Sequence, residues 1–304
     1  MSLDVSALTT WTDENKLELI GKSILKGRTI ANVNLQTGIK RSATINTLNS
    51  DIQFQAGACG WNVSGSTILS QRALTVCDMK LNEAICLNTL EDYYTSTMMK
   101  AGSYGETIPF EQVFAEEKAA QISAYVDDLF WSGDTTLGGG LSLCDGIVKT
   151  ALADASVVDV SGSGGFLAAT AVAQIDAIVA AVPTDVINAE DLTLYIGYDK
   201  YRVYAKALRD ANLFAYSGAE NQGEDFSQMV PGTNVKVMAV RGLNAKNYAV
   251  CTPQSNLYLG TDLVSDMEDF SIFYSRDNDE VRMLAKFKLG FNYAFSDFVV
   301  LGSF

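Results

Sequence analysis

The stretch FEQVFAEEKAAQISAYVDDLFW, residues 110–131, predicts a single helix of about six turns. Five apolar side chains recur along it at spacings of four, three, four and three residues: Ala115, Ala119, Ile122, Val126 and Leu129. This spacing places them on one stripe of the helix. We therefore expect the stripe to lie against a core.

The rest of this helix is acidic. Residues 111–128 contain five acids, among them Glu116, Glu117 and Asp128, and one base, Lys118. Glu117 and Asp128 lie away from the apolar stripe, so we expect the exposed side of the helix to be negatively charged.

Charge is distributed unevenly over the chain. The net charge is −14, which argues against a protein that binds nucleic acid over its whole surface. Residues 16–41 nevertheless hold six bases, including Lys22, Lys26 and Arg28, against one acid. These bases form either a solvated face or an arm that lies on an acidic surface of its own or a neighbouring chain.

The long helix continues into SGDTTLGGGLSLCDGI, residues 132–147, whose glycines invite comparison with phosphate-binding loops. A Walker loop requires G-x-x-x-x-G-K-[ST], but the Lys149-Thr150 pair follows Val148. A dinucleotide fingerprint follows a strand, whereas these glycines follow a helix. We interpret the stretch as a flexible connection.

The absence of histidine from all 304 residues narrows the possible chemistry. It excludes Ser-His-Asp triads, Cys-His dyads and histidine-containing zinc or iron sites. An enzyme would have to use carboxylates or lysine, and no short motif for either is present. We predict no catalytic residue, cofactor or metal.

The cysteines, at 59, 77, 86, 144 and 251, form no C-x-x-C pair. An odd count without a leader peptide predicts reduced thiols, as in a cytoplasm. No uncharged apolar run is long enough to span a bilayer, so we expect no membrane segment.

The first 80 residues contain only three of the 30 aromatic side chains, so we expect no independent core there. Residues 42–55 and 66–80 are rich in Thr, Ile, Leu and Val and predict a long two-stranded ribbon. Phe54 lies in its first strand and Trp61 in its glycine-punctuated tip. Such a ribbon is marginal alone and needs another surface.

The remaining chain alternates between helices and strands. Helices are predicted at 164–182 and 198–210, and short strands at 192–196, 234–240, 247–252 and 256–260. Two long strands, 269–275 and 281–295, flank a turn that contains Asp277, Asp279 and Glu280. The turn lacks the spacing of a calcium loop and is interpreted as a polar hairpin turn.

This order of elements resembles the major capsid proteins of tailed bacteriophages, which have the Hong Kong 97 type of fold. The similarity is greatest to crAss-like and related phages and covers roughly residues 40–304. It is carried by LTVCDMKLNEAICLNTLEDYYTS (74–96), ETIPFEQVFAEEKAAQISAYVDDLFWSGD (106–134), CDGIVKTAL (144–152), LTLYIGYDKYRVYAKALRD (192–210) and NLYLGTDL (256–263).

The resemblance implies an α+β protein with a defined division of the chain. The ranges are an N-terminal arm at 1–41, an extended loop at 42–80, a peripheral domain with the long spine helix at 81–163, an axial domain at 164–260, and a C-terminal hairpin of the peripheral domain at 261–304.

The resemblance also implies a major capsid protein that self-assembles into hexamers and pentamers of an icosahedral head around double-stranded DNA. The chain would assemble in the host cytoplasm and reside in the virion, with separate scaffolding, portal and cement proteins as partners. Contacts between subunits are expected at the arm, the acidic helix, the ribbon and the hairpin turn. We further expect the polar segment 217–228, with Glu220, Glu224 and Asp225, to lie at the capsomer axis.

Two alternatives remain open at this point. One is an encapsulin-like nanocompartment shell of the same fold, which would enclose a protein cargo in place of DNA. The other is a carboxylate-based enzyme, which would be a monomer in solution.

Overall fold

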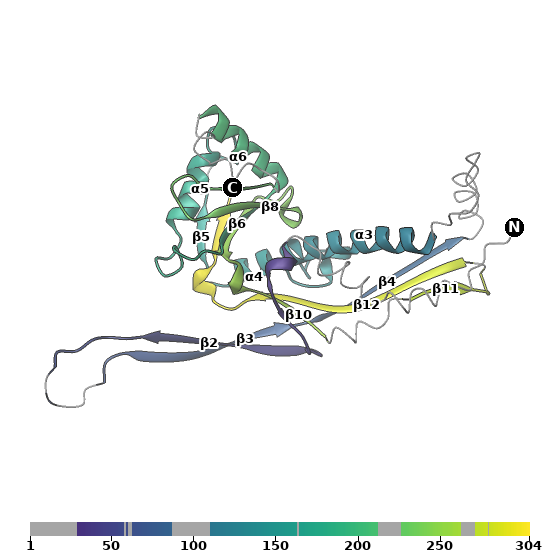
Figure 1. Ribbon diagram of the computed structural model, residues 1–304, viewed down its shortest axis with the longest axis horizontal. Coiled ribbons are helices and arrows are strands. Elements are labelled where there is room, and N and C mark those ends of the chain that lie inside the picture. The colour runs from purple at the N-terminus through teal and green to yellow at the C-terminus, as the bar shows by residue number, and fades with distance from the viewer. Residues whose placement is uncertain are drawn as a thin grey trace.

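The computed structural model describes residues 29–57, 59, 63–86, 110–162, 164–211, 226–262, 271–278 and 280–304. An elongated body carries a two-stranded ribbon that projects from it (Figure 1). Within the described residues the strands form sheets of five, six and two strands, and helices lie on both larger sheets. The predicted α+β class is therefore confirmed.

The five-stranded sheet is built around one long strand, β12 (Glu280–Tyr293). On one edge of β12 lies β4 (Cys77–Cys86), and on the other lie β11 (Ser271–Ser275) and β10 (Leu257–Thr261), all antiparallel to it. The short strand β1 (Asn34–Gln36) extends the sheet beside β10. The pairing of β11 with β12 confirms the predicted C-terminal hairpin.

The helix α3 (Phe110–Ser132) lies over this sheet, as the apolar stripe predicts (Figure 1). Ala119, Ile122, Val126 and Leu129 are at most 7% exposed. The cluster that contains Ile122, Val126 and Leu129 also contains alternate side chains of β12, so the helix and the long strand share one core.

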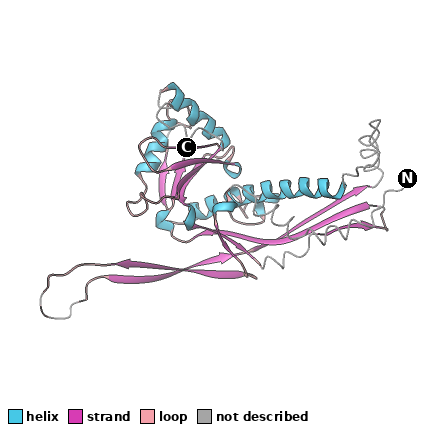
Figure 2. Ribbon diagram, in the orientation of Figure 1, coloured by secondary structure: helices cyan, strands magenta, loops and turns pink. Residues whose placement is uncertain are grey.

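The six-stranded sheet forms the compact part of the molecule, with the strand order β5-β13-β9-β6-β8-β7. Its strands are β5 (Val158–Ser161), β6 (Leu192–Gly197), β7 (Ser227–Met229), β8 (Lys236–Val240), β9 (Tyr248–Pro253) and β13 (Val300–Ser303). The helices α5 (Ala171–Ala180) and α6 (Tyr198–Asp210) cover one face (Figure 2). The end of α3 and the helix α4 (Ile147–Ala153) pack on the other.

Several boundaries differ from the predicted ones. The helix expected at 164–182 begins only at Ala171, because Gly164 and Gly165 have φ angles of +87° and +76°, outside the helical region. We assigned the strand predicted at 256–260 to the α/β unit, but the corresponding strand β10 pairs with β12 in the five-stranded sheet. The strands β5 and β13, which the sequence did not predict, complete the sheet of that unit.

The ribbon, residues 42–75, pairs β2 (Ser42–Asp51) with β3 (Ser66–Thr75) in continuous antiparallel register. Two details of the prediction were wrong. The first strand ends at Asp51, so Phe54 lies beyond it, in a segment without a strand partner. The second strand ends at Thr75, and the following residues form β4 in the other sheet.

Candidate assembly surface

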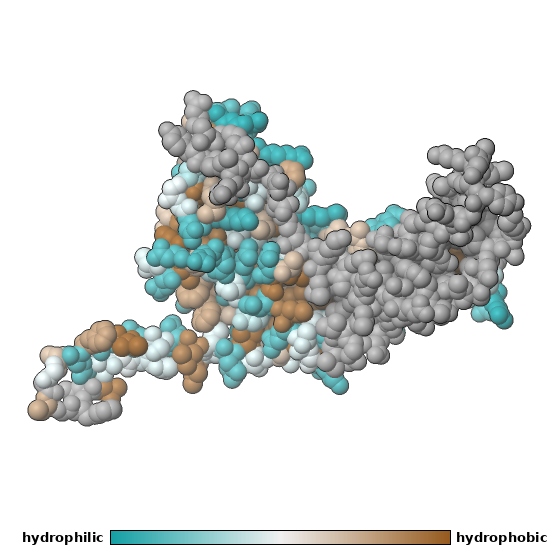
Figure 3. Space-filling view, in the orientation of Figure 1, coloured by the Kyte–Doolittle hydropathy of each residue, from teal (hydrophilic) through white to brown (hydrophobic). Residues whose placement is uncertain are grey.

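The far half of the ribbon exposes apolar side chains. Leu48 and Leu69 are opposite each other in the register and are 59% and 77% exposed. Ile52 and Phe54 follow towards the tip, and Phe54 is 99% exposed. Figure 3 shows hydrophobic residues along this projection. When another surface covers such side chains, the free energy falls by about 25 cal/mol for each Å² of apolar surface that is buried.

The near end of the ribbon is fixed to the body. Ile39, Ile45, Leu74 and Val76 are buried and form a small cluster with Ala294, which follows β12. We call this cluster the ribbon root. Because Ile45 and Leu74 lie in β2 and β3, the ribbon leaves the body at a defined position.

Arg72, in β3, holds the ribbon root by three further contacts. Its Nη2 donates to Asp154 Oδ2 at 2.8 Å, and its Nε donates to Asn292 Oδ1 at 3.0 Å. Its guanidinium lies 3.9 Å from the ring centroid of Tyr293. Burial opposes ionisation of Asp154, but hydrogen bonds from Arg72, Ser156 and Tyr293 lower its pKa. The carboxylate that faces Arg72 is therefore stabilised in its charged form.

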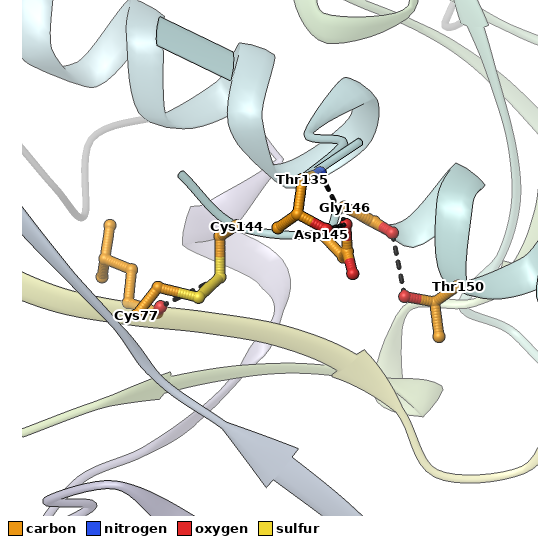
Figure 4. The surroundings of a disulfide bond; sticks show 7 residues. Cys77, Thr135, Cys144, Asp145, Gly146 and Thr150 are labelled. Atoms are coloured by element: carbon orange, nitrogen blue, oxygen red, sulfur yellow. Dashed lines mark hydrogen bonds between the residues drawn. A yellow bond between two sulfur atoms is a disulfide. The ribbon is translucent and has the colours of Figure 1, made fainter. Parts of the chain in front are cut away.

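A disulfide between Cys77 and Cys144 adds a covalent attachment (Figure 4). Cys77 begins β4, directly after the ribbon, and Cys144 lies in the glycine-rich loop after α3. The prediction that all five thiols are reduced was therefore wrong. The two cysteines are 67 residues apart, and only the fold brings their Cα atoms to 5.9 Å.

The other three cysteines are free thiols, as expected. Cys59 and Cys86 are exposed, and Cys251 is buried. Burial raises the pKa of the Cys251 thiol to about 12, so this side chain is an unreactive part of the core.

The two ends of the glycine-rich loop are closely packed, although we expected a flexible connection, whereas residues 135–140 between them are exposed. The amide of Gly133 donates to Leu129 O at 3.0 Å, and the amide of Gly146 donates to Gly133 O at 2.8 Å. A Cβ at either glycine would collide with backbone atoms, so only glycine permits this approach. Asp134 accepts a hydrogen bond from Lys149, which lowers its pKa to about 2. The loop thus holds Cys144 in place against the sheet.

The acids on α3 differ in their surroundings. Glu117 is exposed and accepts from Gln121 at 3.2 Å, whereas Asp128 pairs with Arg241 at 3.2 Å. Burial raises the pKa of Asp128 against the opposing effect of Arg241. Glu116 lies in the helix, but its side chain is outside the described residues.

Asp127 lies on the buried side of α3 and is only 6% exposed. Its Oδ2 accepts from the Gly242 amide at 3.3 Å, while Oδ1 has no partner in the part of the chain that the structure describes. Burial raises the pKa of Asp127, although hydrogen bonds from Thr29 and Gly242 oppose this. Thr29 also accepts from the Trp131 indole at 3.2 Å. The basic arm is therefore anchored to the end of α3 at Thr29.

The other predicted contact residues fall into two groups. Asp277 is exposed in the polar hairpin turn, and Glu280 lies 3.4 Å from Arg282. Several lie outside the described residues: Lys22, Lys26, Arg28, Trp61, Glu220, Glu224, Asp225 and Asp279. Sequence reasoning missed Arg72 and the ribbon root, because their partners come from distant parts of the chain.

Among the described residues, no group of three or more acids or cysteines could hold a metal ion. None of the described helices is long and apolar enough to cross a membrane. A cavity of about 230 Å³ lies between β5 and α5, with Thr170, Gln174 and Phe304 in its wall. No acid or lysine lines this cavity, so it offers no carboxylate chemistry.

Neither a protein-family model nor a curated protein matches the chain. Solved structures do. The chain resembles one from the procapsid of satellite phage P4 with its size determination protein, at 12% identity and a TM-score of 0.60, over 97% of this chain and 98% of that chain. It also resembles the capsid of an empty GTA particle, at 11% identity and a TM-score of 0.60, over 93% and 90%.

A virus-like particle from Pyrococcus furiosus is similar as well, at 12% identity and a TM-score of 0.54, over 95% of this chain and 98% of that chain. At such low sequence identities, the structural similarity establishes the fold alone. It extends over nearly the whole length of both chains in each comparison. This chain therefore has the capsid fold of the tailed bacteriophages, the Hong Kong 97 type.

Proposed function

We propose that this chain is a major capsid protein. Copies of it self-assemble into hexamers and pentamers of an icosahedral head that encloses double-stranded DNA. The protein acts as a structural component of the virion, without catalytic activity, and assembles in the host cytoplasm. Separate scaffolding, portal and cement proteins are its expected partners.

The observation that carries this proposal is the ribbon. It is anchored at one end by Arg72 and the Cys77–Cys144 disulfide, and it exposes Leu48, Leu69 and Phe54 at the other. The apolar side chains at the uncovered end of such a projection are exposed to water, which is unfavourable in free energy. A neighbouring copy that covers this end removes the cost, and the capsid fold supplies such neighbours.

The domain ranges inferred from the resemblance are part of the proposal. The ribbon is the extended loop, and α3 is the spine of the peripheral domain. The six-stranded sheet with α5 and α6 is the axial domain, which gains β5 and β13 from outside the range 164–260. The N-terminal arm, residues 1–41, lies along the assembly, and Thr29 and Ile30 within it anchor it at α3.

An encapsulin-like nanocompartment is the nearest alternative, but no observation supports it better than a phage capsid. The contents of the particle distinguish the two, because double-stranded DNA favours a phage head and a protein cargo favours a nanocompartment. A carboxylate-based enzyme would instead remain a monomer of 32.8 kDa. Electron microscopy and light scattering of the expressed chain decide between a shell and a monomer.

A pair of ribbon variants tests the mechanism of assembly. We expect Leu48→Ser with Leu69→Ser to prevent shell formation and to leave the folding of the subunit intact, since both side chains are exposed in the single chain. Burial of each leucine contributes about 1.5–3 kcal/mol at a contact. The control is Asn46→Ser with Gln71→Ser, an exposed polar pair on the same face of the ribbon.

Light scattering gives the size of the particles, and thermal unfolding of the dilute chain gives its stability. The control pair should assemble like the wild type. Shells formed equally well by the leucine variant would show that the ribbon is not the contact that joins the subunits.

A further inference from the structure

The helix α6 carries an exposed stripe of positive charge. Arg202, Lys206 and Arg209 follow one another at spacings of four and three residues, so they lie on one side of the helix. All three are exposed, whereas the opposite side of α6 is buried against the sheet. We call these three residues the basic stripe.

The basic stripe forms no ion pair with an acid of the described chain, although Asp210 directly follows Arg209. None of its three side chains takes part in an ion pair with a described residue, whereas Lys200, on the same helix, pairs with Asp199 at 3.1 Å. Figure 3 shows hydrophilic residues over the outer side of α6. Like charges three and four residues apart destabilise a helix, by about 0.2–0.5 kcal/mol per pair. In a chain of net charge −14, an uncompensated cluster of this kind favours an acidic partner.

The chain contains an acidic stretch of matching charge. Residues 217–228 include Glu220, Glu224 and Asp225 and no base. We call this stretch the acid segment. The chain ends α6 at Asp210, and it is described again from Phe226, whose ring packs against Tyr198 and Tyr201 of α6, with centroids 5.4 and 6.2 Å apart. The described residues on either side of Glu220, Glu224 and Asp225 therefore both adjoin α6.

We propose that the acid segment of one copy docks on the basic stripe of the next copy in the ring. This inference rests on the proposed shell function, since it requires copies related by rotation. In the proposed arrangement, the acid segment of each copy meets α6 of the next copy around the ring. The contact is heterologous, with different surfaces on the two sides, and such contacts close into rings.

The docking also explains how chains of the same sign of net charge can pack together. Each copy carries −14, so copies repel one another at long range. Three cations that meet three carboxylates at every boundary replace part of this repulsion by local attraction. The attraction acts over about 8 Å at physiological salt and is therefore specific to the docked geometry.

Two charge-reversed chains test the proposal. The first carries Arg202→Glu, Lys206→Glu and Arg209→Glu, and the second carries Glu220→Lys, Glu224→Lys and Asp225→Lys. Each chain alone should need about a tenfold higher protein concentration to assemble, because three exposed pairs of about 0.5 kcal/mol are replaced by repulsion. An equimolar mixture should assemble at nearly the wild-type concentration, because each mutated surface then meets its complement. Hexamers should recover before pentamers, since a ring of five leaves one boundary unmatched.

The controls separate docking from the effect of net charge. The two reversed chains have net charges of −20 and −8, by three reversals of two charges each, so both stay negative and do not attract each other as whole molecules. A chain with Lys40→Glu, Lys236→Glu and Arg276→Glu also has a net charge of −20, but its exposed α6 stripe is unchanged. It should assemble better than the chain with the reversed stripe.

Each contrary result overturns the inference in a recognisable way. A mixture that assembles no better than its components shows that the two surfaces do not meet. If the mixture fails to assemble but a single chain that carries all six reversals assembles normally, the acid segment binds the α6 of its own copy. Empty shells that form normally but lose DNA show that the stripe binds the genome. A wild-type chain that stays monomeric overturns the shell function itself, so this failure is distinct from the others.

Discussion

The disulfide at the base of the ribbon leads to a quantitative prediction. We expect Cys77→Ser with Cys144→Ser to destabilise the folded chain and to loosen the ribbon root. The bond joins the first residue of β4 to the loop after α3, and its ends are 67 residues apart in the sequence. Without it, only noncovalent contacts hold the start of β4 against this loop.

The expected loss follows from the length of the chain that the bond closes. A cross-link between residues 67 apart restricts the unfolded chain by about 4 kcal/mol at 25 °C in the chain-entropy model. Cys144 is 3% exposed, so a serine hydroxyl at this position adds a cost of about 1 kcal/mol. Together these effects predict a loss of about 4–5 kcal/mol in the free energy of unfolding.

Two measurements check this value on protein purified in air without reductant, where dissolved oxygen oxidises the thiol pair. Labelling of the denatured chain should detect three thiols, those of Cys59, Cys86 and Cys251, and five after reduction. Denaturant titration gives the free energy of unfolding. Reductant should lower the stability of the wild type to nearly that of the double variant and leave the variant unchanged.

The matched control is Cys86→Ser, which removes an exposed thiol from the same strand and keeps the disulfide. It should unfold like the wild type. Detection of five thiols before reduction would refute the disulfide itself. Equal stabilities of the oxidised wild type and the double variant would refute the argument that the bond fixes the ribbon root.

Three further predictions concern single side chains. Arg72→Lys should lower the free energy of unfolding by about 2 kcal/mol, because lysine lacks the planar guanidinium that makes several contacts at once. The control Arg41→Lys, at an exposed arginine, should have no effect. Denaturant titration compares the two variants with the wild type. The Lys149 hydrogen bond lowers the pKa of Asp134 to about 2. The ionised Asp134 therefore stabilises the folded chain above pH 3.8, and this stabilisation is lost as the pH falls towards 2. In an acid titration of the free energy of unfolding, Asp134→Asn should show a smaller change over this pH range than the wild type. Burial raises the pKa of Asp127, so its ionisation costs the folded chain stability as the pH rises above 3.8. In denaturant titrations, Asp127→Asn should therefore gain stability relative to the wild type as the pH rises above 3.8.

Local patterns predicted the elements that carry their own periodicity. The helix α3 was predicted to within one residue, because four of its apolar side chains face one core at helical spacing. The helix α6 and the strand β6 were predicted equally closely, since the first has a buried face and the second is buried throughout. In these segments the residues that set the local structure are neighbours in the sequence.

The division between ribbon and sheet could not be predicted in this way. Residues 66–80 have one uninterrupted strand pattern, yet β3 ends at Thr75 and β4 begins two residues later. The chain passes Gly290 of β12 at this point, and a Cβ there would collide with the carbonyl of Thr75. The break depends on a glycine more than 200 residues away in the sequence. A prediction from neighbouring residues alone therefore could not place it.

The predicted contact residues were chosen for their charge, and this explains which functional features were missed. A base such as Arg72 in a polar ribbon has the sequence signature of a solvated side chain, but its partners Asp154, Asn292 and Tyr293 come from two other segments. Through these contacts, Arg72 attaches the ribbon to the body. Among the described residues, Leu48 and Leu69 in the far half have no such partners and are exposed. The ribbon is thus held at its root to residues that adjoin the core around α3 and is uncovered at its end. In the proposed shell, a neighbour that covers this end would be connected through the root to that core.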